Sequence, residues 1–155
     1  MNIFYLHHNT RKCAKYHVDR HVVKMILETC QLLCTAIWLS GGTAKYRKTH
    51  ENHPCAIWTR SNTGNWLWLH SLGLELCSEY TFRYGKVHKT EAILRELSVP
   101  SNIPKGEFQP PPQAMPDEFK NVSCRKAYRD YYAKGKAHLH FWKNRKIPNF
   151  ILKRR

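Results

Sequence analysis

The chain has 155 residues, 42% of them hydrophobic and 12% aromatic, which is typical of one folded domain and excludes a disordered chain. Its 26 Lys and Arg against 11 Asp and Glu give a net charge of +15, so a polyanionic partner is indicated, most simply nucleic acid. The longest nearly apolar stretch, 32–39, is too short to cross a bilayer, and no basic segment precedes an apolar run at the start. We therefore expect an intracellular protein, in the cytoplasm or nucleus of a host cell, that does not bind membranes.

The first part of the chain predicts several helices separated by clear stops. Residues 13–39 contain neither Gly nor Pro and are typical of helix, in one piece or two, up to Gly41 and Gly42. After a basic polar loop, His53 and Pro54 begin a short helical segment that extends to residue 60. Capping residues at 61–64 precede a longer helix over 65–84, which Gly85 ends. A shorter helix is predicted over 90–97.

The second part of the chain is dominated by proline. Six of the eight prolines lie between residues 100 and 116, which excludes helix or central strand there and predicts an extended crossover. A last helix is predicted from about residue 123 to 133, with 142 as its furthest extent, and the basic tail is expected to be solvated. Strand patterns are weak throughout.

Together these elements predict an all-α, mainly helical fold, a single compact domain of about four to five helices with a proline-rich crossover. Residues 1–97 form the helical body with the candidate active site, 98–122 the crossover, and 123–155 the C-terminal helix and basic tail. Six cysteines without an export signal or a Cys-x-x-Cys pair are interpreted as reduced and buried. We expect no metal and no cofactor.

Polar residues of the first long helix occupy one narrow stripe. At about 100° per residue the stripe contains His17, His21, Lys24, Glu28, Gln31 and Thr35, while the rest of the circumference is apolar. Since a helix that is apolar on most sides is buried on most sides, its polar stripe must face a cleft, a partner or an internal network. The stripe is therefore our candidate for a functional site.

Glu28 is the central residue of that stripe, one turn from Lys24. One interpretation is an ordinary Lys–Glu pair, worth a few tenths of a kcal/mol. The other is a partly desolvated carboxylate beside cations, suited to stabilising developing positive charge or moving a proton. His17 and His21 are spaced to share a metal, but no recognisable ligand spacing completes such a site.

A second cluster lies at the end of the 65–84 helix, over residues 79–89. It interleaves the bases Arg83, Lys86, His88 and Lys89 with three aromatic residues. Cations neutralise phosphates and aromatic rings stack on unpaired bases, so the cluster favours nucleic-acid binding. The alternative is that cations simply favour the C-terminus of a helix.

Three segments resemble, in this order, the pyrimidine-dimer DNA glycosylase family typified by the bacteriophage endonuclease V. They are Asp-Arg-His-Val-Val at 19–23 leading to Glu28, the segment 46–58 with His53-Pro54, and the segment 67–89. The last ends in Cys-Ser-Glu-Tyr at 77–80 and Arg-Tyr-Gly-Lys-Val-His-Lys at 83–89. The resemblance covers roughly half the chain, residues 13–89.

The resemblance implies a compact helical domain that kinks damaged duplex DNA and flips a nucleotide. In that family a primary amine attacks C1′ of the damaged nucleotide, the base leaves, a Schiff base forms, and strand cleavage follows by elimination. A helix-borne glutamate stabilises the cationic sugar, and Glu28 falls on its position. The family's amine is the α-amine exposed when the initiator Met is removed, whereas Asn at position 2 resembles a poor substrate for that removal. The attacking group is therefore the α-amine of Met1, the amine of Lys24, or water activated by Glu28.

We expect a monomer that acts on double-stranded DNA with a damaged or modified base. Two alternatives remain: a non-enzymatic nucleic-acid-binding module, with a His/Cys metal site as an option, and a glycosidase on free nucleotides, which the large net charge disfavours. The candidate DNA contacts, several of them inferred from charge alone, are His17, Arg20, His21, His53, Arg60, Arg83, Lys86, His88 and Lys89.

Overall fold

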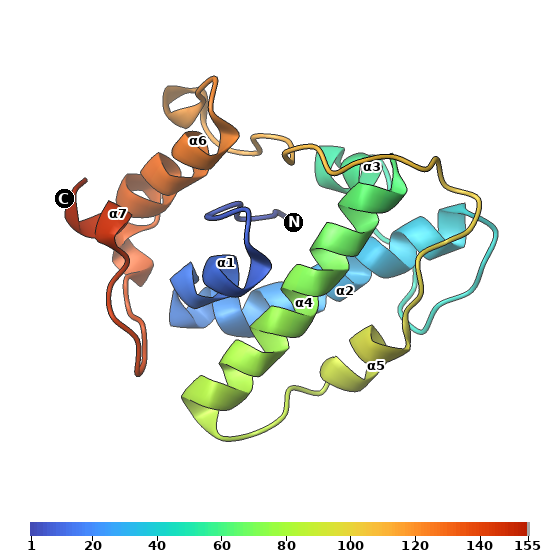
Figure 1. Ribbon diagram of the computed structural model, residues 1–155, viewed down its shortest axis with the longest axis horizontal. Coiled ribbons are helices and arrows are strands. Elements are labelled where there is room, and N and C mark those ends of the chain that lie inside the picture. Colours follow the sequence, from blue (N-terminus) through green and yellow to red (C-terminus); the bar gives the residue numbers. More distant parts are fainter. Residues whose placement is uncertain (155) are drawn as a thin grey trace.

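Two long helices, α2 (Asp19–Leu39) and α4 (Thr63–Tyr84), cross at the centre of the molecule (Figure 1). The computed structural model describes residues 1–154, and that range is helical without a strand, which confirms the predicted all-α class. Residues 1–154 contain seven α-helices, more than the four to five expected, because several are short. The others are α1 (Thr10–Tyr16), α3 (Pro54–Thr59), α5 (Glu91–Glu96), α6 (Cys124–Asp130) and α7 (Asn149–Leu152).

The predicted 13–39 helix is two helices, with a break at His17 and Val18. Both residues are extended, with ψ of 136° and 157°. The His17 ring bonds the Cys13 carbonyl at 2.7 Å, and the Val18 N–H donates to the Tyr132 hydroxyl at 2.9 Å. The break is therefore fixed by a residue more than a hundred positions away, which the local sequence does not reveal.

The ends of the two long helices follow local signals. α2 ends at Leu39, and Gly41 beyond it has φ of 88°. The Asn62 side chain caps α4 by accepting the N–H of Asn65 at 2.8 Å, and Gly85 ends that helix at φ of 69°. These positive φ angles suit glycine, so the predicted stops are confirmed.

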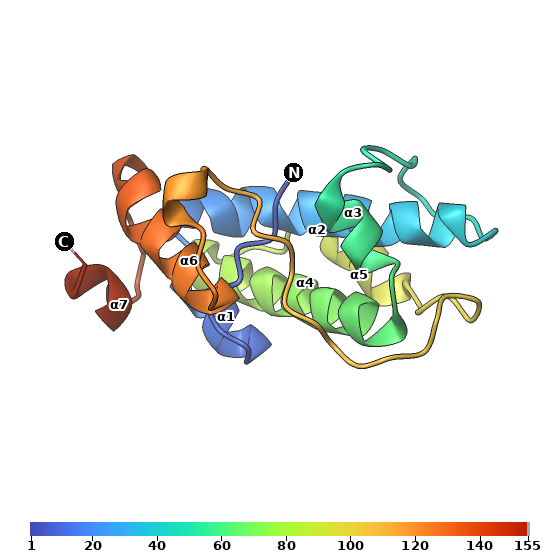
Figure 2. The ribbon, with the colours of Figure 1, turned by 90° about the horizontal axis from the view of Figure 1, so that it is seen from above.

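α2 is the core helix of the protein. Among residues 1–154 it is the one helix long and apolar enough to span a membrane, yet more than half of its most apolar window is buried inside the molecule. It packs on α4 and α3, and the extended segment Ile3–Leu6 is buried with them in the same core. In the view of Figure 2, α2 is drawn above α4, and the N-terminus and the start of α3 lie above α2 in the picture.

The proline-rich crossover is extended, as predicted, and one of its aromatic residues packs against the helical body. Phe108 packs against Trp58 and Trp68, and the Trp58 indole donates to the Gln109 carbonyl at 2.9 Å. A single 3-10 turn, Asp117–Phe119, was not expected there; Pro116 precedes it, where proline is tolerated.

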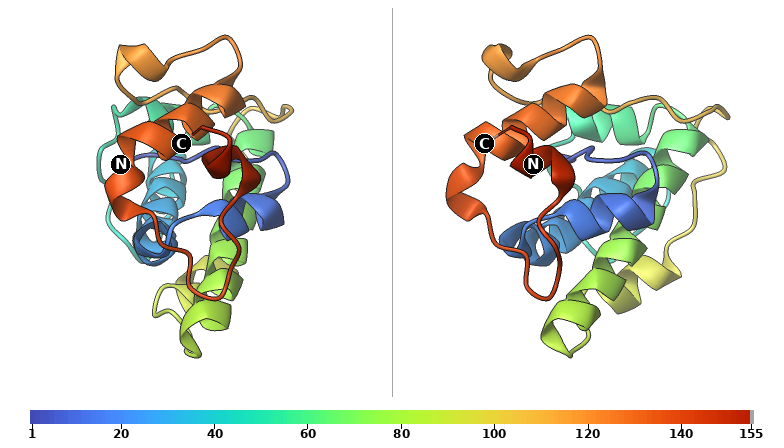
Figure 3. Two further views of the ribbon diagram at one scale, coloured as in Figure 1. Left: turned by 90° about the vertical axis from the view of Figure 1, so that its left-hand side faces the viewer. Right: turned by 60° about the vertical axis from the view of Figure 1, so that its left-hand side comes forward.

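The C-terminal segment packs across one end of the molecule, beside α1 and the start of α2 (Figure 3). After α6 the chain continues through a π-helical turn, Tyr131–Gly135, and a 3-10 turn, Ala137–Leu139. The Trp142 indole then donates to the Tyr16 carbonyl at 2.9 Å. The tail is less solvated than expected, because Arg154 pairs with Asp130; Arg155 lies outside the described residues.

Candidate active site

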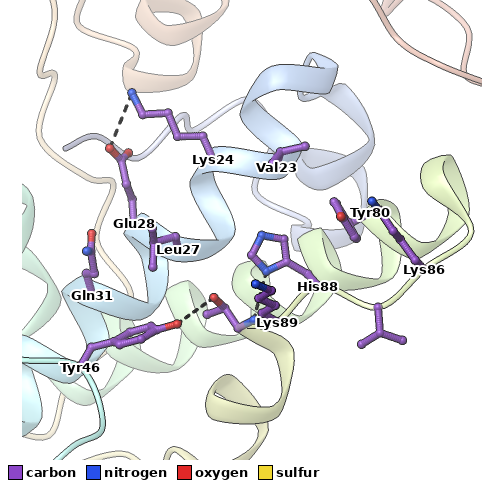
Figure 4. Close-up of a pocket in the computed structure, with 12 residues that line it drawn as sticks. Val23, Lys24, Leu27, Glu28, Gln31, Tyr46, Tyr80, Lys86, His88 and Lys89 are labelled. Carbon is purple, nitrogen blue, oxygen red and sulfur yellow. Dashed lines mark hydrogen bonds and ion pairs between the residues drawn. The ribbon is translucent and has the colours of Figure 1, made fainter.

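Glu28 lies midway along α2 with two amines beside one of its oxygens. The amino nitrogen of Met1 is 3.9 Å from Glu28 Oε1, and Lys24 Nζ is 3.8 Å from the same atom. Figure 4 shows Lys24 and Glu28 pointing toward one another at the edge of a pocket. Both separations exceed hydrogen-bond length, so neither cation fully satisfies the carboxylate. The structure therefore brings together the three predicted catalytic residues.

The two amines differ in how firmly they are held. The Met1 side chain is 3% exposed and that of Lys24 is 69% exposed. The Asn2 side chain donates to the Ala114 carbonyl at 2.9 Å and accepts from the Tyr128 hydroxyl at 3.2 Å. The backbone that carries the Met1 amine is thus fixed to the crossover and to α6, whereas Lys24 ends in a flexible chain at the surface.

A pocket of about 650 Å³ opens next to Glu28, between α2 and the loop after α4. Its volume lies within the usual range for small-ligand sites. Apolar side chains and two tyrosines provide most of the wall, and cations stand at its rim. The lining residues are Val23, Lys24, Leu27, Glu28, Gln31, Tyr46, Tyr80, Lys86, Val87, His88, Lys89 and Thr90.

Hydrogen bonds fix the far wall of the pocket. The hydroxyls of Tyr46 and Thr90 are 3.0 Å apart, and the Thr90 N–H donates to His88 Nδ1 at 3.1 Å (Figure 4). Burial lowers the pKa of His88, although a hydrogen bond to the Val23 backbone opposes the change. His88 is therefore a neutral ring that joins the loop to α2, and the wall is preformed.

The polar stripe of α2, which was expected to face a cleft, a partner or an internal network, borders a pocket along its middle and faces the interior elsewhere. Its middle, with Lys24, Glu28 and Gln31, borders the pocket, but His17, His21 and Thr35 are buried. In their place Val23 and Leu27, which the sequence put among the buried residues, are each 40% exposed and line the pocket. A stripe defined by polarity alone missed this face because the pocket wall is apolar.

His17 and His21 are internal residues, which contradicts the predicted DNA contacts. Burial lowers the pKa of His17 to about 4 and that of His21 to about 3. His21 stacks on Phe4 with ring centroids 4.3 Å apart and bonds the Tyr132 hydroxyl at 2.8 Å. Both rings hold α1, α2 and the C-terminal segment together.

Arg83 is also internal and bound to carboxylates of the fold, not exposed at the surface as the predicted DNA contact would require. Its guanidinium donates to Glu79 Oε1 and to Asp19 Oδ1, each at 2.9 Å, and its side chain is fully buried. Arg145 clamps the same Glu79 from the C-terminal segment, at 2.8 and 3.0 Å. Burial alone would raise the pKa of Glu79, but the hydrogen bonds from Arg145 and Arg83 lower it below its usual range.

The remaining predicted contacts are accessible. Arg20, Lys86 and Lys89 are exposed, and the last two stand at the pocket rim. Arg60 is partly exposed and donates to the Glu51 carbonyl at 2.8 Å, while His53 caps α3. Within residues 1–154 no group of three His, Cys, Asp or Glu side chains is placed to hold a metal ion.

Sequence reasoning missed several pocket residues, namely Tyr46, Val87 and Thr90 as well as Val23 and Leu27. Tyr46 and Val87 lie inside the segments that carried the family resemblance, so that signal was present but was not assigned to a pocket. The loop that contains Tyr46 has no periodic pattern, and only the fold brings it to the start of α5, where Tyr46 meets Thr90.

The site of this basic helical fold thus combines one carboxylate, two amines close to it and a pocket beside them. A family model described as pyrimidine dimer DNA glycosylase matches residues 1–94, more than half of the chain, and the chain belongs to that family. The match includes Met1, Lys24, Glu28 and the whole pocket. The protein is thus a DNA-binding repair enzyme of the glycosylase class. Comparison with curated proteins and with solved structures finds no match.

Proposed function

We propose that the protein is a glycosylase with AP-lyase activity that acts on pyrimidine dimers in duplex DNA. The observation that carries this proposal is the convergence of two amines on one Glu28 oxygen, at 3.8 and 3.9 Å, beside a pocket. A monofunctional glycosylase needs no amine at this position. An amine next to a fixed carboxylate is what formation and resolution of a Schiff base require.

Glu28 supports both halves of that reaction. Its side chain is 15% exposed, so its charge is only partly screened by water. It can take a proton from the amine, which must be neutral to attack, and pass that proton on. As a carboxylate it then stabilises the positive charge that develops on the sugar. After the base leaves, the same carboxylate is placed to assist elimination of the 3′ phosphate.

Met1 is the better nucleophile on geometric grounds. Its amine is held by the packed segment that follows it and by the bonds of Asn2, whereas Lys24 must be ordered from a solvated chain. A positioned nucleophile avoids the entropic cost of ordering at the moment of reaction. Lys24 then contributes a cation that contacts DNA phosphate near Glu28.

The pocket beside Glu28 suits an extrahelical nucleotide. A base removed from the stack needs an apolar or aromatic wall, which Leu27, Tyr46 and Tyr80 supply, and cations for its phosphates, which Lys86 and Lys89 supply. We propose that base flipping places one nucleotide in this pocket and brings the damaged sugar next to the amine.

Borohydride trapping tests the proposal. The protein is incubated with end-labelled, UV-irradiated duplex DNA and borohydride, and covalent complexes are resolved on a denaturing gel. We expect a trapped band for the wild type and for Lys24→Ala, with peptide mapping placing the DNA on Met1. Loss of the band in Lys24→Ala would show that Lys24, and not Met1, is the nucleophile. Alkali-sensitive abasic sites without any band would show a water-using glycosylase and refute the lyase.

A further inference from the structure

His53 is the residue that caps α3, and the helix fixes the state of its ring. Its Nδ1 accepts the backbone N–H of Cys55 at 3.0 Å. Because a backbone amide can only donate, Nδ1 carries no proton, and the neutral ring carries its hydrogen on Nε2. Within the described chain this Nε2–H has no acceptor. The ring therefore offers one hydrogen-bond donor that the fold leaves unused.

His53 directly precedes α3, and the start of this helix lies near the candidate active site (Figures 1 and 2). The start of α3 and the N-terminus lie close together on α2 in two perpendicular views (Figures 1 and 2). Burial, then the Met1 amine and His50, lower the pKa of His53, while Glu28 opposes them. These groups lie on the N-terminal segment, the 43–53 loop and α2, and they leave the ring neutral at pH 7.

We infer that His53 is a further catalytic residue, whose Nε2–H stabilises the negative charge on the departing pyrimidine. This inference rests on the proposed glycosylase function. Glu28 stabilises positive charge on the sugar, and the leaving base needs the opposite, a donor. A neutral imidazole beside a helix N-terminus is a known arrangement for polarising a carbonyl oxygen, as in triosephosphate isomerase.

The step balances without a proton from His53. As the Met1 nitrogen bonds to C1′, the bond from C1′ to pyrimidine N1 breaks, and its electron pair passes into the ring and onto O2. His53 Nε2–H hydrogen-bonds to O2 and keeps its proton, since loss of that proton would leave an imidazolate. The proton released by the attacking amine, passed through Glu28, neutralises the base.

Two substitutions of His53 separate its role as a hydrogen-bond donor from its role as the cap of α3. In His53→Asn the amide oxygen still caps α3, but no N–H reaches the position of Nε2. In His53→Gln an amide N–H reaches that position, but the cap is weakened. We expect base release from dimer-containing duplex, under single-turnover conditions, to slow about 100-fold in His53→Asn. We expect His53→Gln to recover part of the rate despite a lower melting temperature.

A preformed abasic site provides the decisive comparison, because it has no base to lose. His53→Asn should slow base release far more than it slows cleavage of abasic duplex. His50→Asn, the same change at an exposed residue with φ of 50° that asparagine tolerates, should affect neither reaction. Equal slowing on both substrates would show a structural role and overturn the inference, as would unchanged base release. A wild-type protein that releases no base would instead refute the proposed function.

Discussion

Two glutamates on the two long helices have similar partners and opposite surroundings. Glu79 on α4 receives hydrogen bonds of 2.8 to 3.0 Å from Arg83 and Arg145, and its side chain is 4% exposed. Glu28 on α2 also faces two cations, but at 3.8 and 3.9 Å, and a pocket opens beside it. Each glutamate has two positive neighbours, so charge alone does not distinguish them.

The difference lies in how far each carboxylate is satisfied. Every strong bond that Glu79 makes is already formed in the folded protein. It joins α4 to the C-terminal segment through Arg145, it holds Arg83 in place against Asp19 of α2, and it has no capacity left for a substrate. Glu28 keeps its capacity to accept a proton or stabilise a cation, because its neighbours are near but not bonded. Incomplete pairing is therefore the better marker of chemistry in this fold.

Glu28→Gln should produce the largest effect on activity. The amide keeps the size of the side chain but neither accepts a proton nor stabilises a cationic sugar, so we expect base release to fall by about 10³-fold. Stability and DNA affinity should remain near those of the wild type, because no hydrogen bond of the fold is lost. Single-turnover kinetics on dimer-containing duplex and an equilibrium binding assay check this. Unchanged turnover would remove Glu28 from the mechanism.

Glu79→Gln should give the reverse result. Removing the charge leaves the buried Arg83 without its full compensation, and breaking such a pair costs about 3–5 kcal/mol in the free energy of unfolding. Urea denaturation measures this. Glu51→Gln is the matched control, since its pair with Lys48 is exposed and should change stability by less than about 0.5 kcal/mol. Equal stability of the two variants would contradict the structural role of Glu79.

The sequence predicted the fold better than it predicted the site. Helix limits at Gly41, Asn62 and Gly85 depend on local caps, so they are visible in the chain. Arg83 was assigned to DNA because it lies in a basic, aromatic stretch, but its partners come from Asp19 and Glu79. No local pattern distinguishes a cation that faces a distant carboxylate in the core from one that faces solvent.

Contacts from distant parts of the chain also explain why the α2 stripe is only partly exposed. Helical periodicity placed Lys24 and Glu28 on one face, and that placement holds in the structure. It also placed His21 there, but Tyr132 and Phe4 cover that end of the helix. The N-terminal segment and the segment after α6 supply this cover. Their positions depend on tertiary packing, which periodicity does not encode.

The buried histidines should make stability depend on pH. The pKa values of His17, about 4, and His21, about 3, are lowered by burial, whereas an unfolded chain has histidines near the ordinary value. Below about pH 6.5 these histidines are protonated in the unfolded state but stay neutral in the folded state. The free energy of unfolding therefore falls as the pH decreases toward 4. From pH 7 to pH 5 we expect a loss on the order of 2–4 kcal/mol for the two residues.

Urea denaturation at the two pH values measures this loss, and His21→Phe should reduce it by about half, since phenylalanine can keep the stack on Phe4. The Glu79 pKa is also lowered, so its contribution is lost only at more acidic pH, as pH falls through that lowered value. Equal stability of the wild type at pH 7 and pH 5 would show that the two histidines are not buried in solution.

Lys86→Ala should have the smallest effect. It tests whether an exposed cation, unlike one bound to a carboxylate in the core, contributes to DNA binding. Lys86 is exposed at the pocket rim, unlike Arg83 three residues earlier, so it is free to contact a phosphate. Its removal should weaken binding to all duplexes alike and reduce the slope of log K against log salt by about 0.9. Lys105→Ala, an exposed lysine of the crossover outside the pocket, should leave the slope unchanged. If both variants lower the slope equally, the DNA-binding surface extends over the crossover and is not centred on the pocket. Accessible cations that bind DNA would then have to be sought over a wider face of the molecule than the pocket rim.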